Sequence, residues 1–165
     1  MSAIADFRLI EKSKLDDLNK AAEIIIKKGF LKKTVADNYN LYLDSNTKRL
    51  KDFDESGYIF GNLLVYLQEK KEIDLLNSDY DGIANEISKK RGNSTIILTK
   101  NHRDKYSDLL IPEKYSLDDL IAYNVEFSED NDPEFAKGEL KGIRALRDSL
   151  NAIPDDNYIV ILTVG

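Results

Sequence analysis

The feature that most constrains the fold is an almost unbroken apolar run near the C-terminal end of the chain. Residues 158–164 read YIVILTV, in which β-branched and aromatic side chains that favour extended backbone predominate. A strand so apolar has no polar face to present to water. We therefore expect both of its faces to be covered, which places it inside a sheet rather than at an exposed edge.

Two further segments are predicted to be strands of the same sheet. Residues 4–10 alternate roughly between apolar and polar side chains, and residues 95–99 form a β-branched run between turn-prone residues. The three segments are spaced too irregularly for a βαβ repeat, so the pattern favours an α+β fold over a doubly wound α/β fold. We expect a single domain, residues 1–165, in which a small mixed sheet containing the N- and C-terminal strands is packed with about five helices.

The first helix is predicted to begin at Ser13, because Ser13 and Asp16 have the spacing of a capping box. Gly29 stands where the helix would need a residue in the left-handed conformation to end it. The expected buried face consists of side chains at helical spacing, namely Leu15, Leu18, Ala22, Ile25 and Ile26.

Residues 31–56 have the least regular pattern in the chain. Within them, residues 40–44 are interpreted either as a short strand or as a loop held by Leu41 and Leu43. Clearer helical patterns and caps follow further along the chain. They predict four helices. One starts at Tyr58, one covers residues 80–90, one starts at Ser116, and one starts at Asp132, which Pro133 follows.

The charge of the chain is mixed, with 24 basic and 30 acidic residues and a net charge of −6. A nucleic-acid partner is not expected, because neutralising phosphates requires a concentrated basic surface. The chain has no cysteine, which excludes disulfides, a thiolate nucleophile and Cys-ligated metal centres. The N-terminus lacks the pattern of a signal peptide, and no apolar run approaches the roughly 20 residues of a membrane span. We expect a cytoplasmic protein without membrane contacts.

Residues 77–82 resemble the first half of a calcium-binding loop, with oxygen-bearing side chains at alternate positions followed by Gly82. A calcium loop of this kind also needs a bidentate glutamate at its twelfth position, where this chain has Ser88. The favoured interpretation is therefore the acidic N-terminus of a helix, and no metal ligand is predicted.

His102 is the only histidine, and it lies in the densely charged stretch 100–105 directly after a predicted strand. We expect it on an exposed loop. An imidazole can act as a general acid or base, but it needs a nucleophile, an orienting carboxylate or a metal beside it. The sequence alone predicts no catalytic and no cofactor-binding residue.

The polar stretch 126–134 is the strongest candidate for an interaction surface. Its carboxylates could hold a divalent cation or attract a basic partner protein, although acidic clusters of this kind are usually solvated loops that lead into a helix. The candidate interaction residues are Glu129, Asp130, Asp132 and Glu134.

The two ends of the chain resemble the YfbM-like family of small uncharacterised bacterial proteins. The likeness rests on residues 1–7, MSAIADF, which lead into a leucine-rich helix, and on residues 159–165, IVILTVG, where glycine follows an apolar strand. This resemblance implies an α+β fold and a bacterial cytoplasmic protein. It implies no catalytic residue, because the family has no established activity.

Together these observations favour a non-enzymatic protein-interaction domain that binds another protein through an acidic, tyrosine-containing surface. One version of this hypothesis is an immunity-type protein that neutralises a toxin by masking it. The alternative is an enzyme of unrecognised type, a hydrolase or transferase that uses His102 with nearby carboxylates such as Asp104. A small-molecule sensor is a third hypothesis. The oligomeric state is left open.

Overall fold

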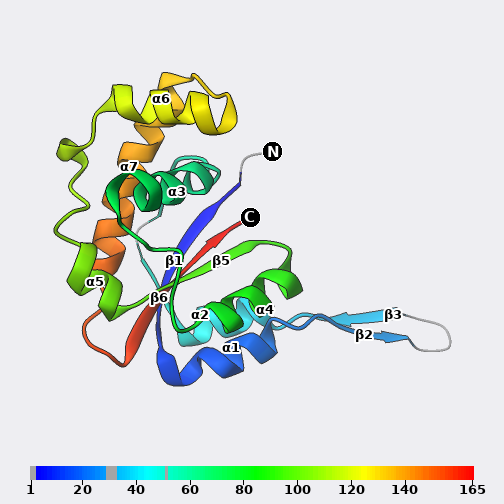
Figure 1. Ribbon diagram of the computed structural model, residues 1–165. Coiled ribbons are helices and arrows are strands. Elements are labelled where there is room, and N and C mark those ends of the chain that lie inside the picture. The colour runs from blue at the N-terminus through cyan, green and yellow to red at the C-terminus, as the bar shows by residue number, and fades with distance from the viewer. Residues whose placement is uncertain (1–2, 29–32, 51) are drawn as a thin grey trace.

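The structure is a computed structural model that describes residues 3–28, 33–50 and 52–165. It confirms the α+β class, with a four-stranded sheet, a separate two-stranded sheet and seven α-helices in these residues (Figure 1). The strands are β1 (Ala5–Glu11), β2 (Ile25–Lys28), β3 (Lys33–Ala36), β4 (Lys48–Arg49), β5 (Ser94–Leu98) and β6 (Tyr158–Val164). The helices are α1 (Leu15–Ala21), α2 (Tyr39–Asn46), α3 (Ile59–Lys71), α4 (Asp81–Arg91), α5 (Lys100–Tyr106), α6 (Leu117–Ser128) and α7 (Pro133–Asn151).

Strand β6 lies in the interior of the four-stranded sheet, as its apolar sequence predicts. The strand order is β4-β1-β6-β5, and β6 pairs antiparallel with both β1 and β5. Its side chains alternate between two hydrophobic clusters, because successive residues of a strand point to opposite faces. Val160 and Leu162 belong to one cluster, and Ile159 and Ile161 belong to the other.

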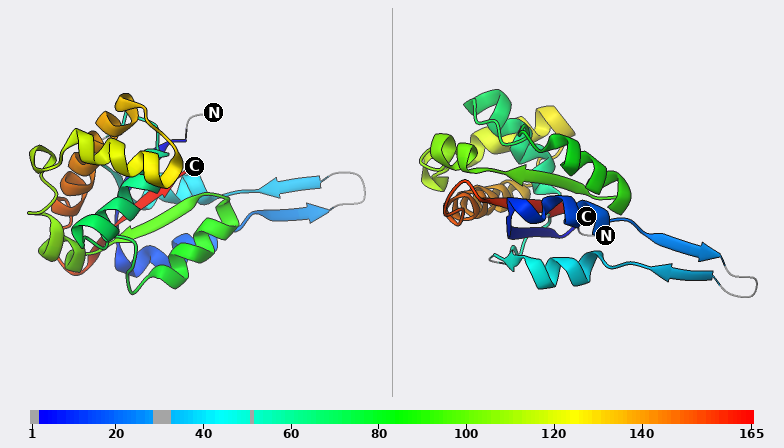
Figure 2. Two further views of the ribbon diagram at one scale, coloured as in Figure 1. Left: turned by 45° about the horizontal axis from the view of Figure 1, so that its top comes forward. Right: turned by 90° about the horizontal axis from the view of Figure 1, so that it is seen from below.

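The helices cover the two faces of this sheet as separate groups. Buried side chains of α3, α6 and α7 pack in the cluster that contains Val160, and those of α1, α2 and α4 pack in the cluster that contains Ile159. Figure 2 shows the sheet between these two groups of helices. The search for a helix long and apolar enough to cross a membrane found none in the described ranges.

Close packing of α7 on α3 explains Gly142, the second of two glycines that lie four residues apart in α7. A Cβ atom added at Gly142 would lie 2.8 Å from Ile59 Cδ1 and 2.9 Å from Leu63 Cδ2. One added at Gly138 would meet Ile59 Cγ2 at 3.5 Å. Gly142 therefore lets the backbone of α7 approach the side chains of α3 to a distance that alanine would not permit without a shift.

The predicted helix starts are largely confirmed. The Ser116 hydroxyl accepts a hydrogen bond from the Asp119 N–H at the start of α6, and the Asp132 carboxylate accepts one from the Glu134 N–H at the start of α7. The helix expected over residues 80–90 is α4, and Gly92 ends it with a φ of 67°. The apolar helix expected from Tyr58 is α3, and the strand expected over residues 95–99 is β5.

The first predicted helix is wrong beyond Ala21. Leu15 and Leu18 are buried as expected, but Ile25 and Ile26 belong to strand β2, which pairs with β3. No side-chain cap opens α1, and Gly29 lies outside the described residues. The physical reason is that three consecutive β-branched isoleucines favour extended backbone once the core contacts of the helix have ended.

The interpretation of residues 40–44 as a strand or loop is also wrong, because they belong to helix α2. The buried side chains of this helix are Tyr39 and Leu43, which are one turn apart, whereas Leu41 is 69% exposed. Leu41 and Leu43 therefore do not both anchor this segment to the core. Leu43 is on the buried side of helix α2, and Leu41 is on its exposed side.

Candidate functional site

The most unusual surface of the molecule is a two-stranded hairpin element made of Ile24, β2 and β3. We call this element the arm. It projects away from the main sheet and its helices, and in the described part of the chain its strands pair only with each other (Figure 1). Its large apolar side chains remain open to solvent. Their exposed fractions are 42% for Ile24, 47% for Ile25, 51% for Ile26 and 60% for Val35.

Exposed apolar side chains occur on both faces of the arm. Ile25 and Ile26 are consecutive residues of a strand, so they point in opposite directions, and Ile26 lies opposite Val35 in the antiparallel register. An isolated two-stranded hairpin is only marginally stable in water, and its unpaired edges can pair with another chain. The arm therefore has the properties of an element that is completed by contact with a partner.

The base of the arm is fixed to the body by a charged contact. Arg91 at the end of α4 donates two hydrogen bonds to the Asp37 carboxylate, each 2.9 Å long, and its guanidinium lies 4.6 Å from the centre of the Tyr39 ring. The Asp37 carboxylate also accepts the Tyr39 N–H at 3.1 Å. The hydrogen bonds from Arg91 and from the Tyr39 backbone lower the pKa of Asp37. These bonds fix the point at which the arm leaves the body.

Charge is distributed unequally along the sequence. Residues 24–36 contain four lysines and no acidic residue, so they carry +4. Of the 24 basic and 30 acidic residues in the whole chain, this leaves 20 basic and 30 acidic residues on the rest, which carries −10. A basic segment of the sequence therefore lies within an otherwise acidic chain.

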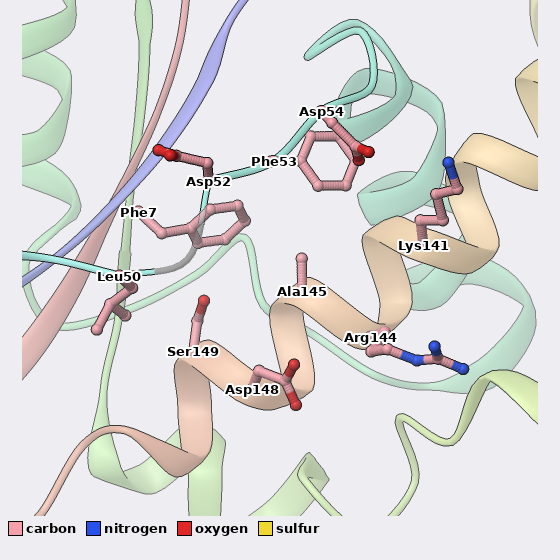
Figure 3. Close-up of a pocket in the computed structure, with 10 residues that line it drawn as sticks. All are labelled: Phe7, Leu50, Asp52, Phe53, Asp54, Lys141, Arg144, Ala145, Asp148 and Ser149. Carbon is pink, nitrogen blue, oxygen red and sulfur yellow. The ribbon is translucent and has the colours of Figure 1, made fainter.

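A second candidate surface is a groove of about 500 Å³ between α7 and the segment that precedes α3 (Figure 3). Its apolar lining comes from Phe7, Leu50, Phe53 and Ala145, and Ser149 points toward Phe7 from α7. Asp52, Asp54, Lys141, Arg144 and Asp148 complete the lining of what we call the groove. This volume is within the range of about 300–1,000 Å³ typical of ligand pockets.

The cations of the groove are already paired with glutamates that do not line it. Lys141 pairs with Glu55, and Arg144 Nη2 lies 3.2 Å from Glu113 Oε1. Of the three aspartates that line the groove, Asp52 pairs with Arg49 at 3.3 Å. Within the described residues, no ion pair involves Asp54 or Asp148. The groove therefore combines an apolar, aromatic lining with charged side chains of both signs.

The expectation that His102 lies on an exposed loop is wrong. It lies in helix α5 and only 4% of its surface is exposed. Its Nδ1 accepts the Thr99 N–H at 3.2 Å, so Nε2 carries the proton that bonds the Asn77 carbonyl at 2.9 Å. Burial lowers the pKa of His102 and favours the neutral ring.

These contacts give His102 a structural role. Thr99 and His102 form a reciprocal capping box at the start of α5, and the spacing of the two residues in the sequence could have revealed it. Asp104, the proposed catalytic partner, bonds instead to Lys100 at 2.5 Å and to Arg103 at 2.8 Å. The structure does not bring His102 and Asp104 together as an acid–base pair.

The turn at residues 77–82, which resembles half of a calcium-binding loop, forms the N-terminal end of α4. Asp81 Oδ1 accepts the Ser78 N–H at 2.9 Å and the Ser78 hydroxyl at 3.0 Å. This geometry agrees with an acidic helix N-terminus, the interpretation favoured by the sequence. Among the residues that the structure describes, no cluster of three or more His, Cys, Asp or Glu side chains is arranged to hold a metal.

The acidic loop is exposed, but its carboxylates make local contacts. Asp130 accepts the Asp132 N–H at 2.8 Å, and Asp132 caps α7 through the Glu134 N–H at 2.9 Å. Glu134 pairs with Lys137 at 2.6 Å, and Glu129 ends α6 with a φ of 59°. Local contacts thus account for the placement of the Asp130, Asp132 and Glu134 side chains, and the role of all four residues in binding stays a prediction.

A buried polar network joins α3, α6 and α7, and sequence reasoning missed it. Asn62 Nδ2 donates to Asn124 Oδ1 at 3.0 Å and to Ser128 Oγ at 2.7 Å, and Asn124 Nδ2 donates to Glu139 Oε2 at 2.6 Å. Glu139 has no exposed surface, and burial raises its pKa to about 7. The network fixes the relative positions of three helices.

Comparison with known proteins supplies no relative from which a function can be transferred. No family model, no curated protein and no solved structure matches the chain. The resemblance of the chain ends to the YfbM-like family stays a prediction, and the function has to be argued from the surfaces described above.

Proposed function

We propose that this protein is a non-enzymatic protein-interaction domain and that the arm is its docking element. The observation that carries the proposal is the set of four large apolar side chains that the arm leaves about half exposed. Soluble proteins seldom place several such side chains together on a projecting element unless they form an interaction site.

The exposed side chains of the arm are sufficient to contribute substantially to a complex. Full burial of an isoleucine or valine side chain is worth about 1.5–3 kcal/mol, so burying the remaining half of each is worth roughly 1 kcal/mol per residue. Four such residues supply about 4 kcal/mol, comparable to the contribution of a binding hot spot. Pairing of the arm's open edges with a partner strand would add main-chain hydrogen bonds.

Two features support an interaction role over the enzymatic alternative. The ring nitrogens of His102 are both engaged by backbone groups, and Asp104 is bonded to Lys100 and Arg103. The hydrolase or transferase hypothesis therefore lacks the acid–base pair on which it was based. In contrast, the arm has an exposed apolar surface for which folding of its own body gives no reason.

A toxin-neutralising protein remains one version of this proposal. The acidic body supports it, because a negative surface accelerates association with a basic protein. This version requires the captured partner to be a toxin whose activity falls when the protein is added. An inhibition assay with that purified partner tests this version separately from the docking function of the arm.

Quantitative capture from a lysate of the native cells tests the docking function. We expect the wild-type protein to retain partners, the endogenous copy of the chain included, that an arm variant with Ile24→Asp and Ile26→Asp loses at least about tenfold. Leu41→Asp is the control, because it changes an apolar residue on α2 that lies outside the arm and is more exposed than Ile24 and Ile26.

Retention of the same proteins by the arm variant would refute the proposal. So would a wild-type protein that retains nothing beyond what the affinity tag alone retains. Circular dichroism and thermal melting of all three proteins confirm that each bait is folded.

A further inference from the structure

We infer that a pocket between α3 and α6 binds a small zwitterion, a molecule of amino-acid size that carries one positive and one negative charge. The two helices lie side by side (Figure 1), and we call the space between them the α3–α6 pocket. Its volume is about 250 Å³, below the range of about 300–1,000 Å³ typical of pockets for drug-sized ligands. The pocket shares no residue with the arm or the groove.

The two walls of the α3–α6 pocket carry opposite charges. Lys70 and Lys71 stand on the last turn of α3, and Asp119 and Glu126 stand on α6. Within the described residues, none of these four side chains takes part in an ion pair. Opposite charges that line one pocket without pairing suit a ligand that carries both signs, because each charge of the ligand can form a charge-assisted hydrogen bond with one wall.

Tyrosine rings hold the two ammonium groups at the pocket. Lys71 Nζ lies 5.6 Å from the centre of the Tyr66 ring and 5.8 Å from the centre of the Tyr115 ring. Lys70 Nζ lies 5.7 Å from the centre of the Tyr123 ring. A cation within about 6 Å of a ring centre is attracted to the ring. These contacts position the ammonium groups and leave them free to donate to a carboxylate that a ligand brings.

The pocket also contains a buried polar atom without a partner. Tyr66 is 2% exposed and its hydroxyl has no hydrogen-bond partner in the described residues, whereas the Tyr123 hydroxyl donates to Glu69 Oε2 at 3.1 Å. Burial raises the pKa of Tyr66 to about 12, and the charge of Asp119 adds to this effect, so the hydroxyl keeps its proton at neutral pH. A carboxylate bound by Lys71, whose ammonium lies over the same ring, would supply the acceptor that this hydroxyl lacks.

A ligand with a single charge fits this pocket less well. A simple cation gains from Asp119 and Glu126 but is repelled by the two lysines, and a simple anion meets the reverse. A free amino acid carries its ammonium and its carboxylate on one carbon atom, so it can bind both walls at once. An apolar or aromatic side chain of the amino acid can pack on the rings of Tyr66 and Tyr123.

Isothermal titration calorimetry of the full chain with matched probes tests this assignment. Phenylalanine, phenethylamine and 3-phenylpropionate share a phenyl ring on a short chain, and they carry both charges, the ammonium alone and the carboxylate alone, respectively. We expect phenylalanine to bind with a Kd below about 1 mM and at least about tenfold more tightly than either analogue. Alanine, titrated in parallel, measures binding of a zwitterion without a large side chain.

Two variants each remove one charge from one wall. Lys71→Met and Asp119→Asn are each expected to weaken phenylalanine binding at least about fivefold. Asp118→Asn is the matched control for Asp119→Asn, because Asp118 is the neighbouring residue in the first turn of α6 and does not line the pocket. Lys105→Met on α5 is the control for Lys71→Met. All four positions are exposed, so each variant is expected to stay folded, which circular dichroism verifies.

Three results would overturn the assignment. The first is that neither phenylalanine nor alanine binds at about 10 mM. The second is that phenethylamine or 3-phenylpropionate binds as tightly as phenylalanine, which would indicate a site for a simple cation or a simple anion. The third is that Lys71→Met or Asp119→Asn binds phenylalanine as tightly as its control variant does. None of these results bears on the docking function of the arm.

Discussion

The buried carboxyl group of Glu139 makes the stability of this protein depend on pH in a predictable direction. Glu139 has no exposed surface, its Oε2 accepts a hydrogen bond from Asn124, and its Oε1 has no partner in the described residues. Burial is the main cause that raises the pKa from 4.5 to about 7, and the negative charge of Asp130 adds to it, while the bond from Asn124 opposes it.

The sign and size of the effect follow from proton linkage. The folded state holds this proton more tightly than the unfolded state, whose pKa is 4.5, so the stabilisation is fully present below pH 4.5 and is lost as the pH rises to about 7. An increase from 4.5 to about 7 corresponds to about 3 kcal/mol of unfolding free energy. Relative to a total stability of about 5–15 kcal/mol, this change is large.

Replacing Glu139 with glutamine isolates this contribution. Glutamine is neutral at every pH and keeps an oxygen that accepts the bond from Asn124. We expect the unfolding free energy of the wild type, minus that of Glu139→Gln, to fall by about 3 kcal/mol between pH 4.5 and pH 8. Urea denaturation followed by circular dichroism measures both proteins at each pH.

The difference between the two proteins removes the effects of other titrating groups. His102 acts in the opposite direction, because burial lowers its pKa and stability is therefore lost as the pH falls below 6.5. Both proteins contain His102, so its contribution cancels. A difference that stays constant from pH 4.5 to pH 8 would refute the reasoning about Glu139, as would a Glu139→Gln protein less stable than wild type at pH 8.

Three further predictions follow from packing and hydrogen bonding. Gly142→Ala is expected to lower the unfolding free energy by about 1–3 kcal/mol, because its Cβ would meet α3 at 2.8 Å. Gly61→Ala, whose Cβ would have nothing within 4 Å, is expected to raise the unfolding free energy by up to about 1 kcal/mol. Thermal denaturation of the two variants compares these effects. His102→Ala leaves two backbone groups without their partner and is expected to cost about 2–4 kcal/mol in urea denaturation; a loss below 0.5 kcal/mol would contradict the structural role. Arg91→Met removes both hydrogen bonds to Asp37, so hydrogen exchange measured by mass spectrometry is expected to become faster in the arm and to stay unchanged in β6. Equal acceleration in the arm and in β6 would contradict this prediction.

The parts of the fold that sequence reasoning predicted correctly are those in which periodicity, caps and burial agree. Strand β6 is apolar over its whole length because both of its faces are covered, and α7 begins at a side-chain cap followed by proline. Such segments carry several independent signals, so an error in one does not change the prediction. The α+β class followed from them.

The arm escaped prediction because helical spacing continued to fit beyond the end of the helix. Ile25 and Ile26 have the right separation from Leu18 and Ala22 to share a helical face, but this face has no core to contact after Ala22. Periodicity records only spacing, and it cannot distinguish a buried face from exposed isoleucines on a strand. The concentration of lysines in residues 24–36 was the available signal that this segment differs from the body.

The candidate sites show a similar limit. His102 has charged neighbours on both sides, which suggested the surface, yet a short helix turns it inward as half of a capping box. No sequence pattern singled out Glu139, although it lies four residues from both Phe135 and Ile143 on α7 and is buried there. The groove joins Phe7 to α7 across the fold, and no local sequence pattern records contacts between segments so far apart.

The pairing of β1 with β6 also determines when the main sheet can form. Ala5 pairs with Val164 and Glu11 with Tyr158, so β1 finds its central partner about 150 residues further along the chain. During synthesis β1 must remain unpaired on this side until β6 emerges, with Phe7 and Ile10 available to other chains in the meantime. Contacts this distant in sequence also slow folding, so this protein is expected to fold slowly and to depend on chaperones at high expression levels.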